Sequence, residues 1–210
     1  MNKYFSEESM LGGFMAKIAD FLLLSLLYLF CSLPLVTAGA SAAALYTVTL
    51  RMARHEERRT VAGFFDAFRE NLRQATLFHL ILTALLFLLG FYGVAVSMLP
   101  GNLRLPFGIL TGIFLAAWLM EAMFVYPVQA RFCGGIRNTM KNAWLMAAAN
   151  FPVFLLTVLI SGLPVWNFLL SPSLFFHFMI VWILLGPGFL AWVNSLLFHR
   201  CFKKCVPEEG

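Results

Sequence analysis

The sequence is poor in charge, and its charged residues are confined to short segments. Asp, Glu, Lys and Arg make up 12% of the 210 residues, whereas the hydrophobic types make up 61%, including 23 Phe. Soluble domains are about 25% charged, and a chain this apolar has too few polar groups to cover a surface in water. The composition excludes a soluble globular domain and indicates a protein whose solvent is lipid.

Motifs that carry catalysis, phosphate binding or metal binding are also missing. The sequence has no Gly-rich phosphate loop, HExxH or GxSxG element. The tail HRCFKKC brings His199, Cys201 and Cys205 together, but without the paired spacing of a metal site. We therefore expect no catalytic residue, no cofactor and no metal, and we expect that the chain is not an enzyme.

The cysteines and the basic residues also argue against two further classes of protein, disulfide-stabilised domains and nucleic-acid-binding proteins. The four cysteines (Cys31, Cys133, Cys201, Cys205) do not make a disulfide framework in such a chain, and three of the four lie in segments that we place in the reducing cytoplasm. The net charge of +5 comes from segments between apolar runs rather than from a basic and aromatic stripe. We expect no nucleic-acid partner.

Long apolar runs divide the chain into predicted transmembrane helices. A helix needs about 20 residues to cross about 30 Å of hydrocarbon. Runs near this length predict spans at about 18–36, 75–98, 106–126, 144–162 and 174–198. The stretch 38–53 is short for a span and rich in Gly, Ala and Ser, which lets another helix approach closely.

Prolines predict where two of these spans bend. A proline removes a backbone donor and lowers the stiffness of a helix. We expect a bend at Pro152 in span 144–162. We also expect a hinge at Gly186, Pro187 and Gly188 in the last span.

Two segments are amphipathic rather than apolar throughout. In 60–74, Phe64, Phe65, Phe68 and Leu72 repeat at helical spacing opposite charged residues. The segment 131–142 combines basic and amide side chains with apolar ones. We expect two amphipathic helices on the cytoplasmic side. The first either lies in the membrane interface or docks on the protein's own spans.

Basic residues alternate between the connections. Six lie between 51 and 73, one in the next connection, three in the following one, none in 164–172 and three in the C-terminal tail. Such alternation predicts a multi-pass protein of the bacterial cell membrane with a cytoplasmic C-terminus. If 38–53 crosses, there are six spans and the N-terminus is inside; otherwise there are five and it is outside. We favour six, as a marginal segment inserts beside neighbours.

Polar side chains within spans are functional candidates, because each is costly in hydrocarbon. Glu121 is the foremost of them, since it lies six residues before Pro127 in span 106–126 with no partner near it in sequence. Asp20 is the second candidate. It lies one turn into the first span, close enough to Lys17 to pair with it near the interface.

The N-terminal third carries a family resemblance. It reads LFCSLPLVTAGASAAALYTV and then FFDAFRENLRQA, and it resembles the YesL-like family of bacterial integral membrane proteins. The matching positions, which are candidate packing residues, include Pro34, Thr37, Gly39, Tyr46, Phe65, Phe68 and Asn71. The biochemical function of this family is unknown. The resemblance implies an association with carbohydrate ABC importers.

Two functions remain open at this point. The first is an auxiliary membrane protein that assists or regulates an oligosaccharide ABC importer, with helix 38–53 packed on permease spans. The alternative is an independent small-solute transporter or channel, with a polar path through Glu121, Thr111 or Asn194. We prefer the first, because a sugar path needs more intramembrane polar groups than the spans offer. The expected partners are the lipid bilayer and permease subunits.

Overall fold

The computed structural model describes residues 2–54, 56, 60–132 and 134–205, and the side chains between 15 and 203 within these ranges. Every element in the described ranges is helical: α1 Asn2–Ser32, the 3₁₀ turn η1 Leu35–Thr37, α2 Ala38–Ala53, α3 Thr60–Ser97, α4 Gly101–Arg131, α5 Ile136–Ala149, α6 Phe151–Ser161, α7 Leu163–Leu170, α8 Pro172–Leu184 and α9 Gly186–Cys205. The predicted all-α membrane fold is confirmed. Part of the predicted basic cluster (57–59) and Cys133 lie outside the described residues.

Helix α2 occupies the centre of the bundle. Helices α1, α3, α4 and α9 all pack against it, and Ala40, Ala43 and Ala44 are completely buried. Small side chains allow this, because they let neighbouring backbones come close. The expectation that 38–53 packs on a permease is therefore wrong, since the chain's own helices cover it.

Helix α3 joins two segments that the sequence analysis separated. The predicted amphipathic helix 60–74 and the span 75–98 form one continuous helix. Its first half docks on the chain's own core, where Phe64 is buried and Phe68 stacks on it with ring centroids 6.4 Å apart. Phe65 and Leu72, expected on the same face, are each 39% exposed. Consecutive helical residues point about 100° apart, and here Phe64 faces the core while Phe65 is partly exposed.

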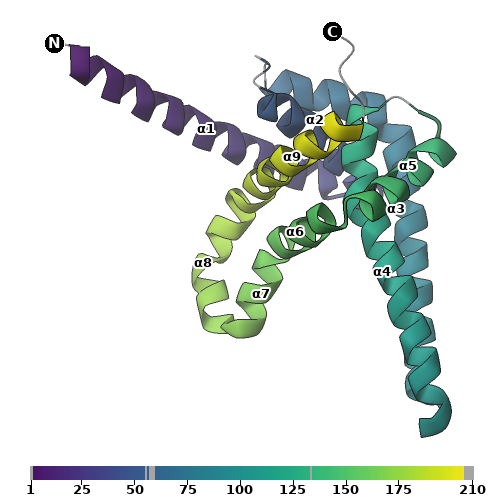
Figure 1. Cartoon of the computed structure of the whole chain (residues 1–210). Coiled ribbons are helices and arrows are strands. Elements are labelled where there is room, and N and C mark those ends of the chain that lie inside the picture. Colours follow the sequence, from purple (N-terminus) through teal and green to yellow (C-terminus); the bar gives the residue numbers. More distant parts are fainter. Residues whose placement is uncertain (1, 55, 57–59, 133, 206–210) are drawn as a thin grey trace.

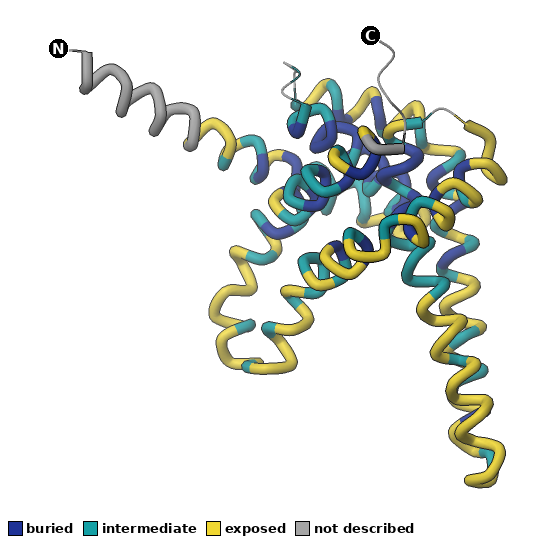
Figure 2. The backbone as a smooth tube through the Cα atoms, in the orientation of Figure 1, coloured by how far each residue is buried: buried dark blue, intermediate teal, exposed yellow. Residues whose placement is uncertain are grey.

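The second half of α3 and the first half of α4 form a hairpin that projects from the bundle (Figure 1). From 101 to 116 in α4 every residue is exposed except Thr111, which is half-buried. Figure 2 shows that most of the projection is exposed, whereas the buried residues are concentrated in the upper body. Such an apolar surface requires lipid or another protein around it.

The last two predicted spans are strongly bent. Helices α5 and α6 meet at 99° around Asn150, and α8 and α9 meet at 72°. The second bend confirms the hinge predicted at 186–188. The first bend, predicted at Pro152, lies two residues earlier, because Pro152 sits in the first turn of α6, where its missing N–H costs nothing.

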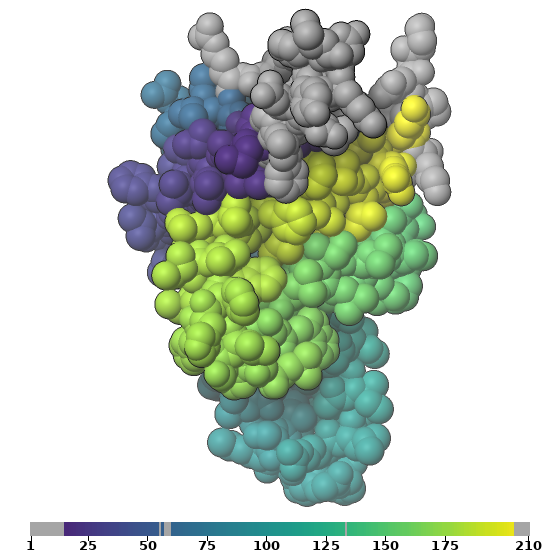
Figure 3. Space-filling model, turned by 90° about the vertical axis from the view of Figure 1, so that its left-hand side faces the viewer, coloured from purple at the N-terminus to yellow at the C-terminus, as the bar shows by residue number. Residues whose placement is uncertain are grey.

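The boundaries in this region differ from the prediction. Helix α5 continues through Trp144 to Ala149, so the predicted helix 131–142 ends too early and the span 144–162 begins inside α5. The connection 164–172 is mostly helical as α7. Together α6, α7 and α8 make a second, shorter projection, which stands apart from the α3–α4 hairpin in Figure 1 and lies in front of its upper part in Figure 3.

The described helices fit several membrane crossings. Met15–Ser32, Leu35–Ala53, Thr60–Ser97 and Gly101–Arg131 are each long and apolar enough, and the total reaches six if each bent pair is one span. More than half of the Leu35–Ala53 stretch (56%) is buried inside the protein. Because neighbouring helices cover most of α2, this short helix can cross the membrane with little direct contact with lipid.

Candidate functional site

A groove opens where the α3–α4 hairpin leaves the bundle. It has a volume of about 600 Å³ and lies between α3 and α4, with α5 covering one end. The α3 side is a leucine-rich stripe that ends at Phe91 and Tyr92. On α4 the lining includes Trp118, whose indole Nε1 donates to the Leu82 carbonyl over 2.8 Å. This hydrogen bond holds the two helices together at the floor of the groove.

Glu121, the foremost sequence candidate, lines this groove. Its Oε1 atom is buried and has no hydrogen-bond partner within the described residues. The other lining side chains are apolar or aromatic, including Trp118, Trp144 and Tyr92. A carboxyl group in such surroundings is costly unless a cation or a hydrogen-bond donor reaches it. The groove is therefore suited to a ligand or partner that supplies one.

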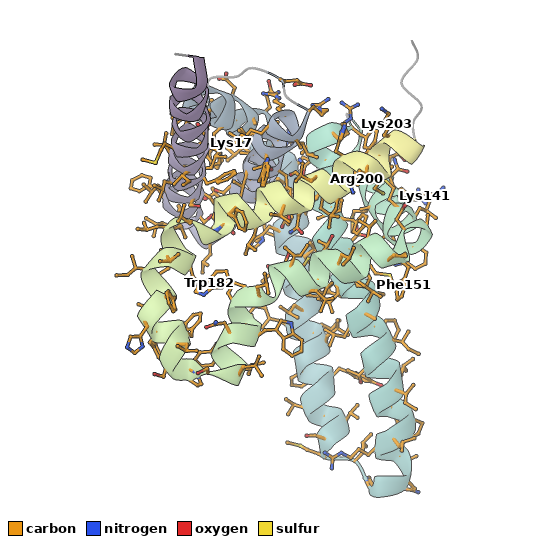
Figure 4. The ribbon with its side chains drawn as sticks, turned by 60° about the vertical axis from the view of Figure 1, so that its left-hand side comes forward. Lys17, Lys141, Phe151, Trp182, Arg200 and Lys203 are labelled. Atoms are coloured by element: carbon orange, nitrogen blue, oxygen red, sulfur yellow. The ribbon has the colours of Figure 1, made fainter. Side chains whose placement is uncertain are left out.

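The covering helix α5 brings Trp144 and Met140 over the groove. Arg137 precedes Trp144 by seven residues and Lys141 precedes it by three, so both basic residues share its side of the helix. Both are exposed, and Figure 4 shows Lys141 at the edge of the molecule. The groove thus has a carboxyl group inside, and the helix that covers it carries positive charge on the side of Trp144.

A second cavity lies beside the α8–α9 hinge. Its volume is about 410 Å³, and its lining includes Tyr28, Tyr46, Ser161, Pro187 and Asn194. The Asn194 amide donates from Nδ2 to Ser161 Oγ over 2.9 Å, while the buried Oδ1 has no partner in the described part of the chain. This cavity offers neutral donors and acceptors.

Several polar pairs in the core were not predicted from the sequence. Thr49 and Ser195 share a hydrogen bond of 2.8 Å, and His79 Nδ1 lies 3.3 Å from the Tyr126 hydroxyl. The partners come from helices far apart in the sequence. The sequence shows only that each of these polar residues lies inside an apolar run. That identifies the single residue but does not predict which residue it pairs with.

Three residues of the family resemblance, Pro34, Thr37 and Gly39, lie at the junction of α1, α2 and α3. The Thr37 hydroxyl contacts the carbonyls of Cys31 (2.7 Å) and Pro34 (2.9 Å), which closes the turn into α2. Gly39 lies against α3 so closely that an added Cβ would be 2.6 Å from His79 Cβ. These residues therefore shape the bundle.

The remaining residues of the resemblance have separate roles. Tyr46 packs edge-on against Phe198, with ring centroids 6.0 Å apart, and lines the cavity at the hinge. Asn71 accepts a hydrogen bond from Gln129, and Phe68 packs in the core. Phe65 is the exception, because it points away from the core.

Asp20 and the hinge glycines also have structural partners. Asp20 Oδ1 accepts a hydrogen bond from Thr60 Oγ1 over 2.8 Å, which ties the start of α3 to α1. Gly188 N donates to Ser25 Oγ over 2.9 Å, so α1 also holds the start of α9. Neither residue lines the Glu121 groove. In the described ranges no three His, Cys, Asp or Glu side chains gather as a metal site would require.

Comparison with known proteins identifies a family for the N-terminal part. A family model described as "Protein of unknown function, DUF624" matches residues 21–91. This family includes the YesL-like bacterial membrane proteins, so the resemblance is confirmed. The match runs from α1 through α2 into α3 and ends before Glu121. No curated protein and no solved structure matches the chain significantly.

Proposed function

We propose that this chain, a YesL-like protein over residues 21–91, is an auxiliary membrane protein of a carbohydrate ABC importer. It assists or regulates the permease and has no catalytic role of its own. The link to carbohydrate import comes from the family resemblance. The C-terminus lies in the cytoplasm of a bacterial cell.

The observation that carries the proposal is the uncovered α3–α4 hairpin. Phe87 on α3 is 76% exposed and Ile113 on α4 is 60% exposed, and neither contributes to the groove. The small-residue helix α2 is already covered by the chain itself. The hairpin is therefore the surface best suited to a permease helix, which would pack against it within the bilayer.

The distribution of basic residues supports the orientation. Lys17, Lys141, Arg200 and Lys203 lie in the upper part of Figure 4, whereas the tip of the hairpin lies at the bottom. Basic residues favour the cytoplasmic side of a membrane protein. In this orientation the hairpin crosses the bilayer and its tip reaches the outer face.

Affinity purification from native membranes, with mass spectrometry of the proteins that co-purify, tests the proposal. The wild type should recover permease subunits in comparable amounts. The double substitution Phe87→Ala/Ile113→Ala should reduce that recovery. A matched control, Leu169→Ala/Leu170→Ala, alters an equally exposed pair on α7 and should leave it unchanged. Repeated recovery of the chain alone would refute the proposal.

The alternative function, an independent small-solute transporter or channel, is favoured by the cavity at the hinge. Asn194, Tyr46 and Ser161 place polar groups there, and the α8–α9 bend adjoins it. Liposomes that contain the purified protein should then exchange small solutes, and Asn194→Leu should abolish the exchange. Tight vesicles would reject this alternative.

A further inference from the structure

The Glu121 groove combines three features that together select a ligand. Inside it, Glu121 supplies a carboxyl group whose buried Oε1 has no hydrogen-bond partner in the described part of the chain. Trp118 and Trp144 line the same space, and aromatic faces attract cations, indole most strongly. The carboxyl group and the rings thus both favour a positively charged group.

The remainder of the groove is suited to a hydrocarbon chain. From Leu82 to Phe91 its α3 side extends over ten residues, about 14 Å along the helix. Leu85 and Leu89 lie between them, and Phe114 faces them from α4. A ligand that fills the groove is therefore amphipathic, with its cation at Glu121 and its chain along the hairpin.

Two basic residues on the helix that covers the groove supply positive charge, opposite in sign to the Glu121 carboxylate. Arg137 and Lys141 lie on the same side of α5 as Trp144 and are exposed. Such residues bind phosphate groups. The predicted span ends at Tyr126, five residues after Glu121, which is about 8 Å further along the helix. Glu121 therefore lies close enough to the end of the span for a lipid headgroup to reach it.

We propose that this groove binds a phospholipid with a primary ammonium headgroup from the surrounding bilayer. The ammonium donates hydrogen bonds to the Glu121 carboxylate between the two indoles, the phosphate pairs with Arg137 and Lys141, and one acyl chain follows α3. A choline headgroup carries the same charge but has no N–H to donate. The groove therefore prefers ethanolamine to choline lipids.

Native mass spectrometry of the purified full-length protein tests this inference. The probes are phosphatidylethanolamine and phosphatidylcholine with identical acyl chains, added in equal amounts. The wild type should retain the ethanolamine lipid roughly tenfold more than the choline lipid, the ratio expected for one charge-assisted hydrogen bond. Glu121→Gln should bring this ratio close to one.

Three further variants separate the parts of the site. Asp66→Asn removes an exposed carboxylate outside the groove and should leave the ratio unchanged. Arg137→Gln/Lys141→Gln should weaken retention of both lipids alike, because both carry the phosphate. The melting temperature of Glu121→Gln shows whether the variant still folds. If Glu121→Gln does not fold, Trp144→Phe takes its place as the test variant. It keeps the carboxylate and weakens the cation–π contact, so it should lower retention of the ethanolamine lipid.

Two results would overturn the inference. One is equal retention of the two lipids by the wild type. The other is an unchanged ratio in folded Glu121→Gln or, where Glu121→Gln does not fold, unchanged retention of the ethanolamine lipid by Trp144→Phe. Neither result depends on whether a permease co-purifies with the chain, so the lipid site and the proposed function are tested separately.

Discussion

Gln129 of α4 donates a hydrogen bond from Nε2 to Asn71 Oδ1 of α3 over 3.0 Å, and Asn71 Nδ2 in turn donates to the Ala67 carbonyl over 2.8 Å. Gln129 is only 7% exposed. The pair therefore joins the two long helices inside the core, before they leave it as the hairpin. Asn71 belongs to the family resemblance, whereas Gln129 lies beyond the matched residues.

Replacing Asn71 by Leu should destabilise the protein, because the buried Gln129 amide loses its acceptor. The expected loss is about 1–3 kcal/mol in the free energy of unfolding. The double variant Asn71→Leu/Gln129→Leu should recover much of it, since no buried donor is left unpaired. Denaturation in detergent measures both. A loss in the double variant equal to the sum of the losses in Asn71→Leu and Gln129→Leu alone would show that the pair is not coupled.

Gly39→Ala should also destabilise the protein. A Cβ at this position would meet the Ala75 carbonyl and His79 Cβ, so α2 and α3 would have to separate. Overpacking of this kind costs about 1–3 kcal/mol. The control is Gly112→Ala on the hairpin, where an added Cβ meets nothing within 4 Å. That substitution should be neutral or stabilising in thermal unfolding, because Ala favours a helix over Gly.

Ser25→Ala should loosen the α8–α9 hinge. The Gly188 N–H is among the first donors of α9, which have no partner within their own helix, and Ser25 Oγ accepts it. Spin labels at His177 and Lys203 should report a broader distance distribution in the variant. Ser97→Ala, which removes only a local bond to the Val94 carbonyl, should not change that distribution. An unaltered distribution in Ser25→Ala would rule out a role for α1 at the hinge.

Cysteine labelling of intact cells tests the proposed orientation. In a background with the native cysteines replaced by Ser, Asn102→Cys at the hairpin tip should react with a membrane-impermeant maleimide. Lys203→Cys should react only after the membrane is permeabilised, because the basic end faces the cytoplasm. The reverse pattern would place the C-terminus outside.

Several elements of the fold could be predicted from local sequence. Apolar runs marked the helices, and the tripeptide Gly186-Pro187-Gly188 marked the 72° bend. Pro152 predicted the other bend within two residues. The boundary of α5 was missed, because the basic and amide residues before Trp144 suggested a separate helix, while nothing at 143–144 interrupts the backbone hydrogen bonds.

The candidate site was predictable only in part. Glu121 was found because a carboxylate in an apolar run is unusual. Trp144 and Met140 could not be assigned to it, since they come from a different helix, α5. Likewise, Asn194 was marked as polar, but its bond to Ser161 joins α9 to α6 and has no local signature.

The sequence by itself determined that this protein lies in a membrane, which segments are helical and where the last helix bends, because hydropathy and proline act locally. Only the tertiary structure decided that α2 is covered by its own chain, that Phe64 rather than Phe65 enters the core, and that Glu121 faces a groove. The physical reason is that lipid and a neighbouring helix are equally apolar, so hydrophobicity does not choose between them. Close packing at small residues such as Gly39, and hydrogen bonds such as that between Gln129 and Asn71, make that choice.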